Sequence, residues 1–157
     1  MEPLFQKVIS DNEAKAKKRD AYDRIVVAGL KLMFSKDTHA MLMEGIDEAP
    51  DVAAWAGEGV VGVLGMLAKN AKGTMPFDEM LLAGVTLLMH GLDFLAQEGR
   101  VEPSVDTITV ATKAYGKKVL SAGGVSDEQL SQMADQATQA TQDPARAEVI
   151  KKHFAGA

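Results

Sequence analysis

Apolar residues recur at helical spacing along most of the chain, and proline and glycine divide this pattern into segments. A first stripe begins after Pro3, and a second runs from Ala21 to Met33. The polar stretch 11–20 between them can continue the first helix as an exposed segment. A short helix that ends near Glu48 is expected next, with Asp37 or Thr38 as its N-cap.

The two strongest helical patterns lie in the middle of the chain. The first starts at Asp51, a plausible N-cap, and reaches about residue 72, and the second spans 77–97 and ends at Gly99. Their apolar faces are Ala53, Ala56, Val60, Leu64, Leu67 and Ala71 in the first, and Leu81, Val85, Leu88, Leu92 and Leu95 in the second. Because the link between them is short, the pattern predicts a central antiparallel hairpin over 51–98.

The last third of the chain continues the helical pattern more weakly. Pro103-Ser104 opens a helix that Gly123-Gly124 closes, Ser126 and Gln129 form a capping box, and Asp143-Pro144 can start a short final helix. We therefore expect an all-α bundle of about six to seven helices without a sheet. Its core covers residues 1–125, and residues 126–157 form a polar C-terminal helical tail.

The composition of the chain excludes several classes of function but does not identify one. The chain has 157 residues, of which 46% are hydrophobic, and this suits a single globular domain. The absence of cysteine excludes disulfides and thiolate chemistry, and a net charge of −5 argues against sequence-specific nucleic acid binding. Residues 1–36 hold eight basic and five acidic side chains, whereas 37–98 hold two and ten. These unlike charges either pair, within or between copies, or form solvated faces.

The sequence predicts a protein made in soluble form in a cytoplasm. Glu2, Pro3 and the charged stretch 11–20 do not fit a secretory signal. No uninterrupted apolar run reaches the roughly 18 residues expected of a spanning helix. The apolar stretch 80–89 contains Thr86 and is followed by His90 and Asp93, so it would insert only within an oligomer that hides them.

A search for chemical motifs indicates a protein that is not an enzyme. None of the three His residues lies in metal-ligand spacing, and no carboxylate lies in an apolar run. Asp47, Glu48 and Asp51 lack the spacing of a calcium loop. The basic cluster of Lys15, Lys17, Lys18, Arg19 and Arg24 fits an ordinary charged helix face better than a phosphate site. We expect no catalytic residue, metal or cofactor.

Four polar residues on one face of the second central helix have three possible interpretations. Thr86, His90, Asp93 and Gln97 share a helix face and are called the polar row below. The row is the wet edge of an amphipathic helix, the lining of a lumen in an oligomer, or the setting of a proton-transfer pair. In the last case Asp93 would raise the pKa of His90.

Glycines form a second unusual feature, because each interior glycine costs a helix about 1 kcal/mol relative to alanine. Gly59, Gly62 and Gly65 fall on one side of the expected helix, and Trp55 and Met66 border them. We call these five residues the glycine face. It predicts close packing against another helix of the chain or against another subunit. The alternative is a loose or kinked helix.

Four stretches resemble a group of small helical proteins from tailed, chiefly short-tailed, bacteriophages. They are Met-Glu-Pro-Leu-Phe-Gln-Lys-Val-Ile-Ser at 1–10, Leu-Lys-Leu-Met-Phe-Ser-Lys-Asp-Thr-His at 30–39, Ala-Lys-Gly-Thr-Met-Pro at 71–76 and Leu-Leu-Ala-Gly-Val-Thr-Leu-Leu-Met at 81–89. The resemblance is one of style over most of the chain and carries over no functional residue. It implies a virion component, present in many copies in a ring or tube. Some such proteins are internal and are ejected with the DNA to form a conduit across the host envelope.

The first hypothesis is therefore a non-enzymatic virion structural protein that binds itself and other virion proteins and makes transient membrane contact. The alternative is a soluble bacterial helical module that regulates or binds one protein partner.

Overall fold

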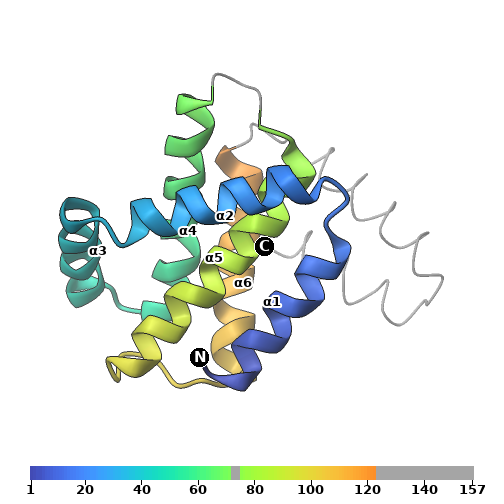
Figure 1. Cartoon of the computed structure of the whole chain (residues 1–157). Helices are drawn as coiled ribbons and strands as arrows, with labels where there is room; N and C mark the ends of the chain where they lie inside the picture. Colours follow the sequence, from blue (N-terminus) through green and yellow to red (C-terminus); the bar gives the residue numbers. More distant parts are fainter. Residues whose placement is uncertain (72–74, 123–157) are drawn as a thin grey trace. The chain divides into compact units, whose positions relative to one another are not determined.

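The computed structural model describes residues 1–71 and 75–122, and it divides the chain into helices much as the sequence pattern predicts. This part of the chain contains six helices and no strand, so the prediction of an all-α fold is confirmed (Figure 1). The helices are α1 (Pro3–Lys15), α2 (Arg19–Met33), α3 (Lys36–Glu48), α4 (Val52–Asn70), α5 (Phe77–Gln97) and α6 (Val105–Ala122).

Local capping explains several of these boundaries. The Asp51 carboxylate accepts a hydrogen bond from Ala54 N at 3.2 Å, and the Ser104 hydroxyl accepts one from Thr107 N at 3.2 Å. Gly99, with a φ of 70°, ends α5 as predicted. Neither Asp37 nor Thr38 caps α3, which already begins at Lys36. The polar stretch does not extend the first helix to residue 20, because α1 ends at Lys15.

The chain divides into two compact units, Met1–Tyr115 and Gly116–Ala157, and the division falls inside α6. It precedes the predicted boundary between residues 125 and 126. The expected tail 126–157, with its capping box at Ser126 and Gln129 and its helix start at 143–144, lies outside the described residues. The unit Met1–Tyr115 contains every surface discussed below.

Helix α5 is the centre of the first unit, because it contacts α1, α2 and α4. Leu87, Leu88, Met89 and Leu92 are completely inaccessible to solvent. The predicted face of α5 is only partly confirmed: Leu88, Leu92 and Leu95 are buried, whereas Leu81 and Val85 are half-buried. Since neighbours surround α5 on several sides, its buried surface extends well beyond one stripe.

Three buried polar side chains form a seam along α5. Glu79, Thr86 and Asp93 are spaced by seven residues, or about two helical turns, and therefore lie in one row. Their burial corrects the expectation that no carboxylate lies in an apolar run. We call these three residues the polar seam.

Each member of the polar seam binds α1 or α2. The Asp93 carboxylate accepts a hydrogen bond from Glu2 N at 2.9 Å, and the Glu79 carboxylate accepts one from Lys18 N at 3.0 Å. Glu2 and Lys18 are the N-cap residues of α1 and α2, so each carboxylate also faces the positive end of a helix dipole. Between them, the hydroxyls of Thr86 and Tyr22 are 2.5 Å apart.

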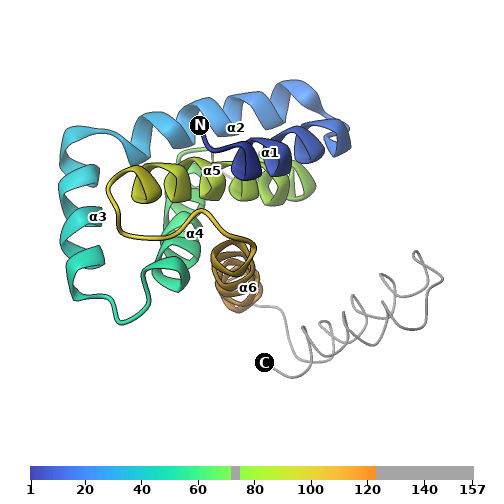
Figure 2. The same cartoon turned by 90° about the horizontal axis from the view of Figure 1, so that it is seen from below.

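These contacts fix the directions of the two N-terminal helices. The N-terminal end of α1 lies beside Asp93 of α5. Farther along α1, the Asn12 side chain donates a hydrogen bond to the carbonyl oxygen of Leu82 at 3.4 Å, so α1 runs antiparallel to α5. The N-terminal end of α2 lies beside Glu79 of α5, and Met33 at its C-terminal end lies beside Gly91. Helix α2 therefore runs parallel to α5. Figures 1 and 2 show both helices lying along α5.

Helix α4 packs on α5 through the predicted apolar residues Ala53, Ala56, Val60 and Leu64, all of which are buried. In Figures 1 and 2, however, α4 crosses α5 rather than following it along its length. The antiparallel hairpin expected over 51–98 is therefore not confirmed.

The first part of α6 completes the unit through two glycines. A Cβ on Gly57 would overlap the carbonyl oxygen of Ala111, and a Cβ on Gly84 would overlap the hydroxyl of Tyr115. This hydroxyl donates to the carbonyl oxygen of Leu81 at 2.9 Å, and burial raises the pKa of Tyr115. Close approach of α6 to α4 and α5 thus requires glycine at both positions.

We expect the Thr86→Val variant to lose about 1–3 kcal/mol of unfolding free energy, because the buried Tyr22 hydroxyl would lose its partner. Tyr22→Phe combined with Thr86→Val should cost less than the sum of the two single variants. Urea denaturation of the four proteins measures this coupling, and additive losses would contradict it.

Candidate functional site

The structure divides the glycine face into a covered and an open part. The indole ring of Trp55 lies against Gly45 of α3, 2.5 Å from the position that a Cβ would occupy there. A Cβ added at Gly59 would lie 3.8–4.0 Å from side-chain atoms of Trp55 and Leu42. At this end, α4 therefore packs on another helix of the same chain, as one alternative of the prediction had it.

The open part consists of Gly62, Gly65 and Met66. A Cβ on either glycine would meet no atom within 4 Å, and Met66 is 40% exposed. Within the described residues, nothing in this chain packs against these positions. The other alternative, packing against a second subunit, stays a prediction for this part of the face.

Comparison with the other helical glycines of this unit makes the open part unusual. Added Cβ atoms at four of these six, Gly29, Gly45, Gly57 and Gly84, would each come within 3.0 Å of a neighbouring side chain or backbone atom, and those at Gly59 and Gly91 would make ordinary contacts at 3.8 and 3.4 Å. At the first four positions, close packing within the chain requires glycine. Gly62 and Gly65 instead lie mid-helix where the described residues leave space for a side chain, so packing among these residues does not explain them.

The members of the polar row are placed very differently from one another. Thr86 and Asp93 are buried, with 2% and 8% of their surface exposed, and belong to the polar seam. His90 is half-buried and Gln97 is exposed. In the folded chain, Thr86 and Asp93 therefore bind neighbouring helices of the same unit and line neither a wet edge nor a lumen.

The His90–Asp93 pair does not have the geometry of a proton-transfer couple. One Asp93 oxygen accepts from Glu2 N, and the other accepts from the Gln97 amide at 2.8 Å. Within the described residues, no hydrogen bond joins His90 to Asp93. Asp93 was expected to raise the pKa of His90, but burial has the larger, opposite effect and lowers this pKa.

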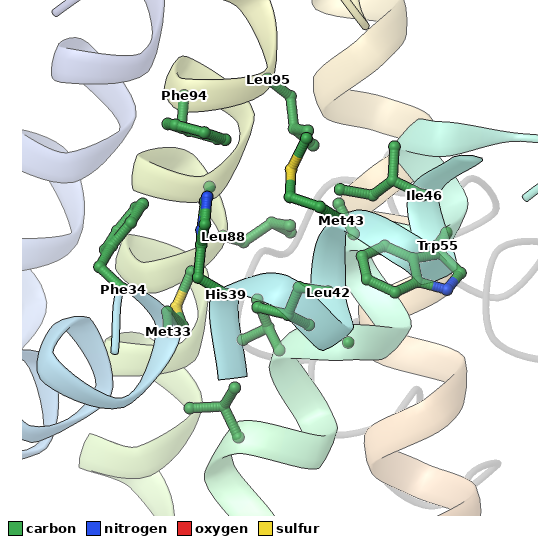
Figure 3. A pocket seen from close by; sticks show the side chains of 15 residues that line it. Met33, Phe34, His39, Leu42, Met43, Ile46, Trp55, Leu88, Phe94 and Leu95 are labelled. Atoms are coloured by element: carbon green, nitrogen blue, oxygen red, sulfur yellow. The ribbon is translucent and has the colours of Figure 1, made fainter. Parts of the chain in front are cut away.

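An apolar groove is the second candidate site, and the sequence did not predict it. Residues of α3, α4 and α5 and the end of α2 line it, and the cavity volume is about 50 Å³. Figure 3 shows Phe34, His39 and Phe94 near one end and Ile46 and Trp55 near the other. The lining residues are Met33, Phe34, His39, Leu42, Met43, Ile46, Trp55, Ala56, Gly59, Val60, Val63, Leu88, Gly91, Phe94 and Leu95.

Aromatic contacts organise one end of the groove. The ring centroids of His39 and Phe94 are 5.1 Å apart in an edge-to-face arrangement, and those of Phe34 and Phe94 are 5.7 Å apart. Phe34 nevertheless remains 44% exposed. His39 supplies the one side-chain hydrogen-bonding group at this end, so the groove is suited to apolar groups.

Exposed carboxylates are concentrated on α3 and the first part of α4, outside the lining of the groove. Residues 37–68 contain six acidic residues and no lysine or arginine, and all six are exposed: Asp37, Glu44, Asp47, Glu48, Asp51 and Glu58. Asp47 pairs with Arg100 at 2.6 Å, and Asp51 caps α4. Within the described residues, no group of three or more His, Asp or Glu side chains is placed to hold a metal ion.

The basic cluster lies away from the groove, around the connection between α1 and α2. Arg19 pairs with Glu13 at 3.5 Å and with Asp23 at 3.1 Å, while Lys15, Lys17 and Lys18 are exposed. The arrangement is that of a charged helix surface, which agrees with the interpretation preferred from the sequence.

Helices α4 and α5 are each long and apolar enough to cross a membrane, judged by length and composition. Neither helix was predicted as a span from the sequence, because neither contains an uninterrupted apolar run of about 18 residues. Buried core helices pass the same test, and α5 is buried over 56% of the tested window. Comparison of the chain with protein-family models, curated proteins and solved structures found no match.

Substitution by alanine should have opposite effects at Gly84 and at Gly62. Gly84→Ala forces a Cβ against the Tyr115 hydroxyl and to 2.8 Å from a Leu64 methyl carbon, so we expect a loss of about 1–3 kcal/mol. Gly62→Ala finds open space and should add about 1 kcal/mol to the stability of the monomer. Thermal denaturation of dilute protein tests both, and a destabilised Gly62→Ala monomer would contradict the assignment of open space.

The lowered pKa of His90 predicts a specific pH dependence. The unfolded chain binds a proton at His90 near pH 6.5, whereas the folded chain binds it only at lower pH. The contribution of neutral His90 to stability is therefore complete above about pH 6.5 and is lost as the pH falls toward the folded pKa. Between about pH 7.5 and 5.5, the wild-type protein should lose more unfolding free energy than His90→Gln; equal losses would exclude this linkage.

Proposed function

We propose that this chain is a non-enzymatic structural protein that self-associates through the open part of its glycine face. The observation that carries the proposal is the open space at Gly62 and Gly65. Glycine weakens a helix by about 1 kcal/mol per residue, and at these two positions packing against the described part of the chain does not require it. A neighbouring helix that approaches this flat surface closely would require it.

A second copy of the chain is the proposed neighbour. Two glycine surfaces are complementary to each other, because neither presents a side chain that would keep the backbones apart. Met66 borders the glycines, is 40% exposed and can adapt its shape to a neighbouring surface. The contact would therefore combine close backbone approach with burial of an exposed apolar side chain.

The proposed setting is a bacteriophage virion, and it rests on the resemblance of the four sequence stretches described above. In this setting the protein is made in soluble form in the host cytoplasm and joins a ring or tube with other virion proteins. The finer proposal is an internal protein that is ejected with the DNA and contributes to a conduit across the host envelope. The length and composition of α4 and α5 are compatible with transient membrane contact in that role.

The alternative function is a soluble bacterial module that binds one protein partner. The apolar groove favours this alternative, because its apolar, partly open lining could receive one apolar side chain of a partner. The genes adjacent to the coding sequence distinguish the settings: capsid, portal or tail genes fit the virion, and their absence favours the module.

Replacing Gly62 by leucine should disrupt self-association while leaving the helix content unchanged. The leucine side chain would keep a second copy away from α4, yet it faces open space within the monomer. Sedimentation velocity measures assembly and circular dichroism measures helix content. Ala14→Leu, at an exposed position of α1, is the matched control and should assemble normally.

Two results would overturn the proposal. One is a wild-type protein that stays monomeric at high concentration and binds no virion protein or liposome. The other is a Gly62→Leu variant that loses helix content and assembly to the same extent.

A further inference from the structure

Four exposed residues form a straight stripe along the open side of α4. Glu58, Gly62, Gly65 and Lys69 are all exposed, and they follow one another at steps of four, three and four residues. Because each residue turns a helix by about 100°, the four positions fall within about 60° of its circumference. Alternating steps of four and three residues are the spacing of the seam along which two helices pair. We call these four residues the α4 stripe.

The two ends of the α4 stripe carry opposite charges. Within the described residues, neither the Glu58 carboxylate nor the Lys69 ammonium group forms an ion pair. The two residues are 11 positions apart on one helix, or about 16 Å along its axis, so they do not reach each other. Between them, a Cβ added to either glycine would meet no atom within 4 Å. The stripe is therefore a flat surface with one charge of each sign at its ends.

This arrangement makes the α4 stripe complementary to itself in one orientation. When a second copy of α4 lies antiparallel across the midpoint between the glycines, Gly62 of each copy faces Gly65 of the other. The same alignment brings Glu58 of each copy opposite Lys69 of the other, because each lies four residues beyond a glycine. A parallel alignment in register would place glutamate against glutamate and lysine against lysine. Charge complementarity therefore favours the antiparallel orientation.

We infer that two copies of the chain associate through an antiparallel, two-fold symmetric pair of α4 helices centred between Gly62 and Gly65. The glycines allow close approach, and the two symmetric pairs of Glu58 with Lys69 set orientation and register. Exposed ion pairs add little affinity, so their role is to exclude the parallel arrangement. Such a contact closes on two copies, and a ring or tube would need a second interface. The inference rests on the proposed self-association and adds its geometry.

Charge reversal tests the orientation on the full chain, with sedimentation velocity as the measure of association. Glu58→Lys places lysine against lysine at both ends of the antiparallel pair, and Lys69→Glu places glutamate against glutamate. We expect each single variant to raise the dimer dissociation constant at least about tenfold, because two contacts change from attraction to repulsion. The double variant Glu58→Lys/Lys69→Glu restores opposite charges and should associate like the wild type. An equal mixture of the two single variants should form mixed dimers.

Matched controls separate the α4 stripe from the net charge of the chain. Asp11→Lys and Lys7→Glu make the same changes of charge at exposed positions of α1 and should leave association unchanged. Circular dichroism should show equal helix content for all variants, because positions 58 and 69 are exposed. Raised salt should strengthen the association of the two single variants, because it screens the repulsion between like charges.

Cross-linking measures the orientation independently, since the chain contains no cysteine. A short thiol-specific cross-linker should join a mixture of Glu58→Cys and Lys69→Cys, because the antiparallel pair brings these two positions together. Either variant alone should not be joined, since equivalent positions of the two copies lie about 16 Å apart along the helices. Ala14→Cys, at an exposed position of α1, is the control for random collision.

Four results would overturn the inference, and they distinguish it from the proposed function. A wild-type protein that stays monomeric overturns both. If Gly62→Leu abolishes association but neither single charge reversal changes it, self-association through the glycines stands and the antiparallel geometry is wrong. A double variant as weak as the single variants would show that Glu58 and Lys69 do not face each other. Cross-linking of Glu58→Cys alone as efficiently as of the mixture would show parallel pairing.

Discussion

Two buried carboxylates and the helix ends that they bind are the interaction on which the rest of the structure depends. A carboxylate removed from water is strongly unfavourable unless hydrogen-bond donors replace the water. Asp93 finds its donors in the Glu2 backbone amide and the Gln97 side chain, and Glu79 finds a donor in the backbone amide of Lys18. Because each amide belongs to a helix N-terminus that needs an acceptor, both partners gain from the same contact. Helices α1 and α2 are thereby held on α5 at defined positions along its length.

With α1 and α2 held on one side of α5, the surfaces of α4 carry the unusual features of this unit. One side of α4 packs on α5, and the N-terminal part of its glycine face is covered by α3. Gly62 and Gly65, farther along the helix, are open. Helix α4 thus takes part in the core, the groove and a flat exposed surface. The core therefore keeps the groove and the flat surface in constant geometry relative to each other.

The fold class and most helix boundaries were predictable because they depend on local signals. Proline, glycine and capping residues such as Asp51 act over a few residues, and the structure confirms the Asp51 cap. The unusual side of α4 was also predictable, because glycines at helical spacing are visible in the sequence. The sequence did not indicate which of them are covered, since this depends on the position of α3.

The polar seam and the groove were not predictable, because both depend on contacts between distant parts of the chain. Thr86 and Asp93 were recognised as sharing a face, but that face was interpreted as solvent-exposed or lumen-lining, and Glu79 was overlooked. Their partners lie 64 and 91 residues away in the sequence. The heptad spacing of Glu79, Thr86 and Asp93 was the one available signal, and it acquires meaning only when α1 and α2 are placed on α5.

Recognition of backbone amides by the seam has a consequence for how this sequence can diverge. Every amino acid except proline supplies the amide that Asp93 and Glu79 bind at positions 2 and 18. The side chains at those two positions are thus free to drift in evolution while the anchoring is inherited unchanged. Only the acceptor side chains at 79 and 93 need to be conserved. In natural variants we therefore expect positions 79 and 93 to vary less than their partners at positions 18 and 2.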